Sequence, residues 1–141
     1  MDDLLKELNK FRGKFPKELV MYYPYPAQKE ALAKGEIKLY RNDGGGIDGY
    51  VWVKNLKTKG VSRIEEIYSL KRGLGSIMME DAKRFAAFNT IELKVLDFNE
   101  RAIGFYLKHG FTEVSREEGK KKNNILMRYI KGENKEQLTL F

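Results

Sequence analysis

The sequence predicts a mixed α/β (α+β) domain built on one central sheet. Four segments carry apolar residues at helical spacing, and six others alternate apolar and polar residues as strands do. Stretches rich in glycine or proline separate several of them. The predicted order is α-α-β-β-β-α-β-α-β-β, with helices flanking a mixed, mostly antiparallel sheet.

The four predicted helices start and stop at recognisable residues. Residues 2–12 place four apolar side chains on one stripe and two acidic residues at the positive end of the helix. In the next segment, Pro26 suits a helix start and Gly35 a helix end. The third helix is predicted over residues 73–88 and the fourth over residues 99–109.

The predicted strands form two hairpins and two central segments. A turn "DGGG" joins the first two strands, and a basic turn "EEGKKK" joins the last two. Without repeats or a linker, residues 1–131 are predicted to form one domain, followed by a polar tail over residues 132–141. The predicted strands are residues 37–42, 47–56, 61–70, 90–98, 111–116 and 123–130.

Composition limits the chemistry. The absence of cysteine excludes disulfides and thiol nucleophiles, and a single histidine argues against a histidine-based metal site, so no metal is expected. The net charge of +7 favours polyanionic partners, although solubility alone would also explain it. No apolar run is long enough for a membrane span, and the N-terminus does not resemble a secretory signal, so we expect a cytoplasmic location without membrane contact.

The stretch "SLKRGLGS" places Gly73 and Gly75 between a predicted strand and a predicted helix. Amides at a helix N-terminus bind anions, and glycine lets a phosphate approach the backbone. However, a dinucleotide-binding fingerprint would need a third glycine at Met78, and the chain has no Walker loop. Taken alone, the stretch is either a phosphate loop or a plain strand-to-helix turn.

The later stretch "NERAIGFYLKHGF", residues 99–111, is a short amphipathic helix with Asn99 as its N-cap and Gly110 after its end. It resembles the C-terminal motif of the GCN5-related N-acetyltransferases (GNAT family), and the glycine stretch lies where that family binds a pyrophosphate. With the element order, the resemblance covers residues 1–130. It implies a GNAT-like fold and an acyl-CoA-dependent N-acyltransferase that uses acetyl-CoA.

The resemblance implies where the cofactor binds. Amides of residues 71–76 would hold the pyrophosphate, and Asn99 would lie beside the pantetheine arm. The strand over residues 65–69 would splay from its neighbour and pair with the pantetheine amides. The residues that the resemblance places at the cofactor are Ile67, Tyr68, Ser69, Lys71, Arg72, Gly73, Leu74, Gly75, Ser76, Asn99, Ala102 and Phe105.

The resemblance further implies direct attack by a primary amine in a ternary complex, with Tyr106 as the general acid that protonates the departing thiolate. Strand alternation predicts Glu65 and Glu66 on opposite faces, so that one would face the cleft as the base. A water relay is the alternative, and both glutamates would also balance the basic chain. Tyr22 and Tyr23 fall in the acceptor-side region, where they are equally suited to structural packing. The acceptor is not indicated.

The last five residues, "QLTLF", resemble the bacterial sliding-clamp-binding peptide through Gln137, Leu138, Leu140 and Phe141. Packing on the domain itself, or on a dimer mate, would also cover these apolar side chains; the chain is expected to be a monomer or a homodimer. Clamp binding implies an acceptor associated with DNA. Because Leu70 stands where the family has Arg or Gln, the alternative is a non-catalytic adaptor with this fold, recruited to DNA through the clamp.

Overall fold

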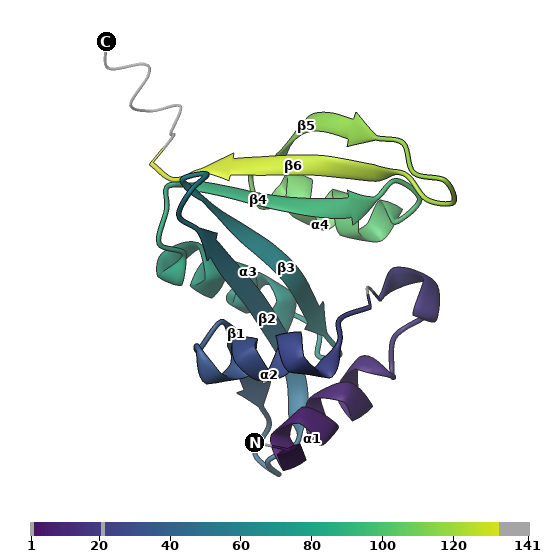
Figure 1. Ribbon diagram of the computed structural model, residues 1–141, viewed down its shortest axis with the longest axis vertical. Coiled ribbons are helices and arrows are strands. Elements are labelled where there is room, and N and C mark those ends of the chain that lie inside the picture. The colour runs from purple at the N-terminus through teal and green to yellow at the C-terminus, as the bar shows by residue number, and fades with distance from the viewer. Residues whose placement is uncertain (1, 21, 133–141) are drawn as a thin grey trace.

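The computed structural model describes residues 2–20 and 22–132. Its six-stranded sheet has the order β1-β2-β3-β4-β6-β5 (Figure 1), and every neighbouring pair is antiparallel except β3 and β4. The predicted element order and the mostly antiparallel sheet are confirmed. The elements are α1 (Asp2–Arg12), η1 (Lys17–Leu19), α2 (Tyr25–Ala33), β1 (Ile37–Arg41), β2 (Ile47–Leu56), β3 (Val61–Ser69), α3 (Leu74–Phe85), β4 (Thr90–Leu96), α4 (Glu100–Lys108), β5 (Thr112–Glu117) and β6 (Asn124–Ile130).

Helices cover both faces of the sheet (Figure 1), and an apolar core lies on each face. Helices α1 and α2 pack on one face, where Leu8 and Phe11 meet Tyr50 and Trp52. Helices α3 and α4 pack on the other face, against strands β2, β3, β4 and β6. None of the helices in the described ranges is long and apolar enough to cross a bilayer.

Helix α3 is shorter than the sequence predicts, ending at Phe85 rather than at residue 88. The Ala87 amide donates to Asn55 Oδ1 at 3.0 Å, and the Phe88 amide donates to Ser62 Oγ at 3.1 Å. These two strand side chains replace the helical acceptors, so the chain leaves the helix without a glycine or a proline.

Strands β3 and β4 separate halfway along their length (Figure 1). Their parallel pairing runs from Val61 and Thr90 to Ile64 and Leu93, whereas β3 continues to Ser69 and β4 to Leu96. The predicted splay of β3 from its neighbour is therefore confirmed, and it leaves unpaired strand edges facing each other.

A β-bulge lies in β3 where the two strands begin to separate. Trp52 of β2 pairs with Glu66, but Val53 pairs with Ile64, so the three residues of β3 from Ile64 to Glu66 face two residues of β2. A bulge bends its strand and turns the following side chains toward the other face.

Gly49 of β2 lets the first turns of α3 pack close to the sheet. A Cβ at this position would lie 2.7 Å from Met78 Sδ, 2.8 Å from the Tyr68 carbonyl oxygen and 3.1 Å from Leu74 Cδ2. Glycine is therefore required here by space. This contact fixes the position of the N-terminus of α3 relative to β3.

We expect Gly49→Ala to lower the free energy of unfolding by about 1–3 kcal/mol through overpacking. Gly104→Ala is the matched control, because an added Cβ in α4 would meet nothing within 4 Å. That change should raise the free energy of unfolding by about 0.5–1 kcal/mol through better helix propensity. Chemical denaturation measures both, and equal stabilities of the two variants would contradict the close-packing argument.

Candidate active site

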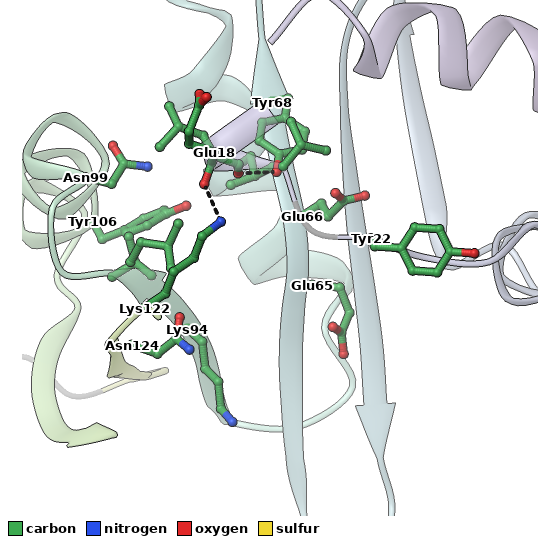
Figure 2. Close-up of a pocket in the computed structure, with 15 residues that line it drawn as sticks. Glu18, Tyr22, Glu65, Glu66, Tyr68, Lys94, Asn99, Tyr106, Lys122 and Asn124 are labelled. Atoms are coloured by element: carbon green, nitrogen blue, oxygen red, sulfur yellow. Dashed lines mark hydrogen bonds between the residues drawn. The ribbon is translucent and has the colours of Figure 1, made fainter. Parts of the chain in front are cut away.

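A pocket of about 410 Å³ lies between the diverging ends of β3 and β4 (Figure 2). The N-terminus of α4, the segment around η1 and the β5–β6 turn complete its walls. It is lined by Glu18, Leu19, Val20, Tyr22, Glu65, Glu66, Ile67, Tyr68, Lys94, Val95, Leu96, Asn99, Tyr106, Lys122 and Asn124.

The two glutamates of β3 both line this pocket, so the prediction that they lie on opposite faces is wrong. Glu65 bonds to Tyr23 and Glu66 bonds to Arg12, and both partners belong to the α1–α2 side of the sheet. The β-bulge is the reason, since it interrupts the alternation between these neighbours.

Glu66 is held in a buried ion pair. Arg12 Nη2 donates to Glu66 Oε2 at 2.9 Å, and the Tyr50 hydroxyl donates to Glu66 Oε1 at 2.8 Å. Arg12 Nε also donates to the Tyr50 hydroxyl, at 3.0 Å. Burial raises the pKa of Glu66, and the Arg12 guanidinium opposes that rise. Both carboxylate oxygens have strong donors, so Glu66 is poorly placed to take a proton from a substrate.

Glu65 is the less constrained of the two. The Tyr23 hydroxyl donates to Glu65 Oε2 at 2.8 Å. Burial raises the pKa of Tyr23, and the charge of Glu65 raises it further, so the phenol stays a donor and the carboxylate an acceptor. The Tyr23 ring packs on Trp52 with the ring centroids 4.5 Å apart. Tyr23 thus orients Glu65 instead of lining the pocket itself.

Tyr106 of α4 and Asn99, the N-cap residue of that helix, point into the pocket toward β3 (Figure 2). Burial raises the pKa of Tyr106 to about 12, so its hydroxyl carries a proton throughout the neutral range. Among the described residues, none accepts or donates a hydrogen bond at this hydroxyl. Asn99 Oδ1 accepts a hydrogen bond from the Ala102 amide at 3.2 Å, which confirms the predicted N-cap. The side-chain nitrogen of Asn99 therefore points toward the pocket (Figure 2).

Two side-chain hydrogen bonds hold the η1 segment over the pocket. The Tyr68 hydroxyl donates to the Leu19 carbonyl at 3.1 Å, and Lys122 Nζ donates to the Glu18 carbonyl at 3.2 Å (Figure 2). The first bond comes from β3 and the second from the β5–β6 turn. Together they close the outer side of the pocket, where Tyr22 is exposed and points away from Tyr106.

The glycine stretch forms a turn into the N-terminus of α3. Gly73 has a φ of +85°, which disfavours any side chain, and it precedes the first residue of the helix. A Cβ at Gly75 would lie 3.3 Å from Phe105 Cε1, so this glycine allows α3 and α4 to approach. First-turn amides of a helix have no intrahelical acceptor, and Lys71 and Arg72 are exposed beside them. Residues 71–76, called the cradle below, thus combine backbone donors with positive charge, which fits a pyrophosphate.

The remaining predicted cofactor residues surround this cradle. Ser69 Oγ accepts the Lys71 amide at 3.2 Å, which shapes the turn before Gly73. Ala102 and Phe105 pack against the core on the α3–α4 face, and Phe105 lies against Gly75. Leu70, where a polar residue was expected, is 52% exposed.

Several pocket residues were missed by sequence reasoning, namely Glu18, Leu19, Val20, Lys94, Val95, Leu96, Lys122 and Asn124. They come from turns and strand ends without motifs. Arg12 was missed too, although it carried a signal: it follows Leu5 and Leu8 on the buried side of α1, where a charged residue needs a partner. The residues of the predicted clamp-binding tail lie outside the described ranges.

The sheet, the opening between its central strands and the adjoining cradle are those of an acyltransferase domain. The model of the acetyltransferase (GNAT) family matches residues 8–111, which is more than half of the chain. The chain therefore belongs to the GNAT family, as the sequence motif predicts, and the predicted class of enzyme, an N-acetyltransferase, is confirmed. Acetyl-CoA is the acetyl donor that membership implies. No curated protein sequence matches the chain.

Solved structures share the fold. Naa20 of Chaetomium thermophilum, in complex with a bisubstrate analogue, has a TM-score of 0.76 at 16% identity, covering 89% of this chain and 83% of that one. Arabidopsis thaliana Naa50, bound to the bisubstrate analogue CoA-Ac-MVNAL, has a TM-score of 0.72 at 23% identity, covering 92% and 93%. Against nourseothricin acetyltransferase the TM-score is 0.61 at 20% identity, covering 69% of this chain and 66% of that one.

We expect Arg12→Met to lower the free energy of unfolding by about 3–5 kcal/mol at neutral pH, because it leaves a buried carboxylate without its cation. Without Arg12 the pKa of Glu66 rises further in the folded state, so the native variant binds more protons than the unfolded chain. Its stability therefore falls as the pH rises above about 4.3, the unfolded value, and the deficit against wild type shrinks toward acidic pH.

The double variant R12M/E66Q is the matched control. A glutamine keeps an oxygen for the Tyr50 hydroxyl but brings no charge, so the double variant should be more stable than R12M at pH 7.5. Denaturation curves at pH 4.5 and 7.5 measure both effects. A deficit of R12M that is the same at the two pH values, with no rescue by E66Q, would show that the ion pair is not the cause.

Proposed function

We propose that this chain transfers an acetyl group from acetyl-CoA to a primary amine by direct attack in a ternary complex. The observation that carries the proposal is that one pocket holds both a protonated phenol, Tyr106, which has no hydrogen-bond partner in the described part of the chain, and a carboxylate, Glu65, which accepts a hydrogen bond from Tyr23. When bound, acetyl-CoA supplies the thioester whose acetyl group is transferred. Tyr106 and Glu65 divide the proton transfers between them.

Cofactor binding is assigned to the cradle and to the opened edge of β3. Within residues 71–76, the Lys71 amide already donates to Ser69 Oγ and the Leu74 amide to the Lys71 carbonyl. The other amides of this segment would hold the pyrophosphate, with charge added by Lys71 and Arg72. The backbone of β3 beyond Ile64, released from β4, offers hydrogen-bonding groups for an extended pantetheine arm. Asn99 lies on the opposite wall, where its amide nitrogen can donate to the same arm.

Each acid–base residue has one task in this scheme. Glu65 accepts a proton from the attacking amine, directly or through one water, while the Tyr23 hydroxyl keeps the carboxylate in place. Tyr106 donates its proton to the departing sulfur, and its raised pKa ensures that the proton is present at neutral and moderately alkaline pH. Glu66 serves structure through Arg12, and we assign it no proton transfer.

The acceptor is proposed at the level of a primary amine. Tyr22 is 87% exposed at the pocket rim, where it can contact an acceptor. The analogue bound to Naa50 carries the peptide sequence MVNAL, so a peptide α-amine is the first acceptor to assay. An amine on a DNA-associated protein is the second.

We expect calorimetry to show acetyl-CoA binding by the wild-type chain, and Tyr106→Phe to keep that affinity while kcat falls by about 10²-fold or more. Tyr25→Phe is the matched control, because it removes a hydroxyl from an exposed ring that does not line the pocket. Release of free thiol in the presence of peptide amines measures the rate. Wild-type kcat should not decline up to about pH 10, since a donor with a pKa of about 12 is still protonated.

An absence of heat with acetyl-CoA at high protein concentration would reject the enzyme and favour the alternative of a non-catalytic adaptor. A kcat of Tyr106→Phe equal to that of wild type would reject Tyr106 as the acid while leaving the transferase standing.

We also propose that the terminal sequence "QLTLF" docks on a bacterial sliding clamp and brings the domain to DNA. The support is the sequence pattern, in which Gln137 and the three apolar residues around Thr139 occupy the fixed positions. The net charge of +7 suits a location beside DNA.

Deleting residues 137–141 should abolish pull-down of the chain by a purified sliding clamp, because the anchoring side chains are lost. Thr139→Ala is the matched control and should bind as the wild type does, since this position is the variable one in the pattern. Circular dichroism checks that the fold persists. Undiminished pull-down of the truncated chain would refute clamp docking by this peptide.

A further inference from the structure

The His109 side chain contacts two residues of α3, Ser76 near the N-terminus of the helix and Glu80 one turn further along it. His109 is the C-cap residue of α4, and its side chain is 11% exposed. Its Nε2 lies 3.2 Å from Ser76 Oγ, and its Nδ1 lies 3.4 Å from Glu80 Oε2. The ring packs on Phe105 with the centroids 4.5 Å apart, so it is fixed on one face as well. His109 does not line the active-site pocket.

The partners decide which ring nitrogen carries the proton. The hydrogen bonds from Lys83 and His109 lower the pKa of Glu80 against the effect of its partial burial, which raises it, so Glu80 is an ionised acceptor. In the neutral ring Nδ1 therefore holds the hydrogen and donates to Glu80, and Nε2 accepts from Ser76. In this state the Ser76 hydroxyl hydrogen points at His109, and only oxygen lone pairs remain for any neighbour.

Protonation of His109 reverses that bond. Nε2 then donates to Ser76 Oγ, and the hydroxyl hydrogen is released to turn toward another acceptor. Ser76 is the third residue of α3, so its hydroxyl belongs to the first turn of the helix, where amides lack intrahelical acceptors. Protonation therefore adds one donor and one positive charge to the cradle.

The charged groups around His109 do not offset the hydrogen-bond donor and the positive charge that protonation adds. On α3, Lys83 Nζ lies 3.1 Å from Glu80 Oε2 and donates to the His109 carbonyl at 2.7 Å, so the glutamate is already balanced by a cation. On β6, Tyr129 presents its ring face to Lys83 at 4.0 Å. On α4, the C-terminal end of the helix dipole favours a cation at His109.

We propose that the Ser76–His109–Glu80 chain links proton uptake by His109 to binding of the cofactor pyrophosphate at the N-terminus of α3. The inference rests on the proposed assignment of this cradle to CoA. His109 acts through Ser76 and is a positioning residue, not a catalytic one. By linkage, protonated His109 strengthens pyrophosphate binding, and bound pyrophosphate raises the proton affinity of His109 by the same factor.

The chain has a single histidine, so the imidazole resonances report His109 without assignment. The probe is dephospho-CoA, which keeps the pyrophosphate of CoA but lacks its phosphate monoester. The second pKa of a phosphate monoester is about 6, so its own titration would overlap that of a histidine. We expect the NMR titration midpoint of His109 to rise by about 0.5–1 pH unit when the probe is bound. Correspondingly, the Kd measured by calorimetry should be about three- to tenfold lower at pH 5.5 than at pH 8.5.

His109→Gln is the matched variant, because its amide keeps hydrogen-bonding capacity but does not titrate, and its Kd should be the same at both pH values. Ser76→Ala should bind more weakly and lose most of the shift in the His109 midpoint. Binding of the probe with an unchanged midpoint in the wild type would overturn the linkage alone. Absence of binding at every pH would overturn the proposed cofactor site, and the linkage with it.

Discussion

The separation of β3 from β4 after Ile64 and Leu93 is the constraint on which the site depends. Backbone groups released from a parallel ladder must find other partners, because buried unpaired amides and carbonyls are costly. Here they border a pocket open to solvent and to an extended ligand. The bulge at the same point bends β3 away, and the close contact at Gly49 keeps α3 against the bent strand. Strand divergence, pocket and anion cradle are thus one geometric unit.

The ion pair between Arg12 and Glu66 ties α1 to this unit. A buried pair contributes little net stability compared with an apolar pair of the same size, but each partner strongly requires the other. The pair therefore specifies where α1 docks: its C-terminal end must lie over the bulge, where Glu66 and the Tyr50 hydroxyl meet. Through that docking, α1 positions the η1 segment that Tyr68 and Lys122 hold over the pocket.

Local chemistry made much of the fold predictable. Asn99 caps α4 and Gly110 follows its end with a φ of +90°, as expected from residue type alone. The end of α3 was not predictable, since it depends on Asn55 and Ser62, which reach the chain from distant strands. The same distinction holds in the site. Motifs indicated the cradle and Tyr106, whereas the partnerships of Arg12 with Glu66 and of Ser76 with His109 join residues 54 and 33 positions apart.

The bulge at Glu65 is the feature that alternation could not foresee, and it explains how one strand supplies two different carboxylates. In a regular strand, neighbouring glutamates would point to opposite faces, and a single one would reach the pocket. With the bulge, both reach it. Glu66 lies nearer the core, where Arg12 balances its charge and the Tyr50 hydroxyl donates a hydrogen bond to it. Glu65 lies at the more open edge, where it accepts a hydrogen bond from the Tyr23 hydroxyl and has lone pairs left for a further donor. The irregularity in the backbone thus separates a structural carboxylate from the one that we propose as the acceptor of the amine proton.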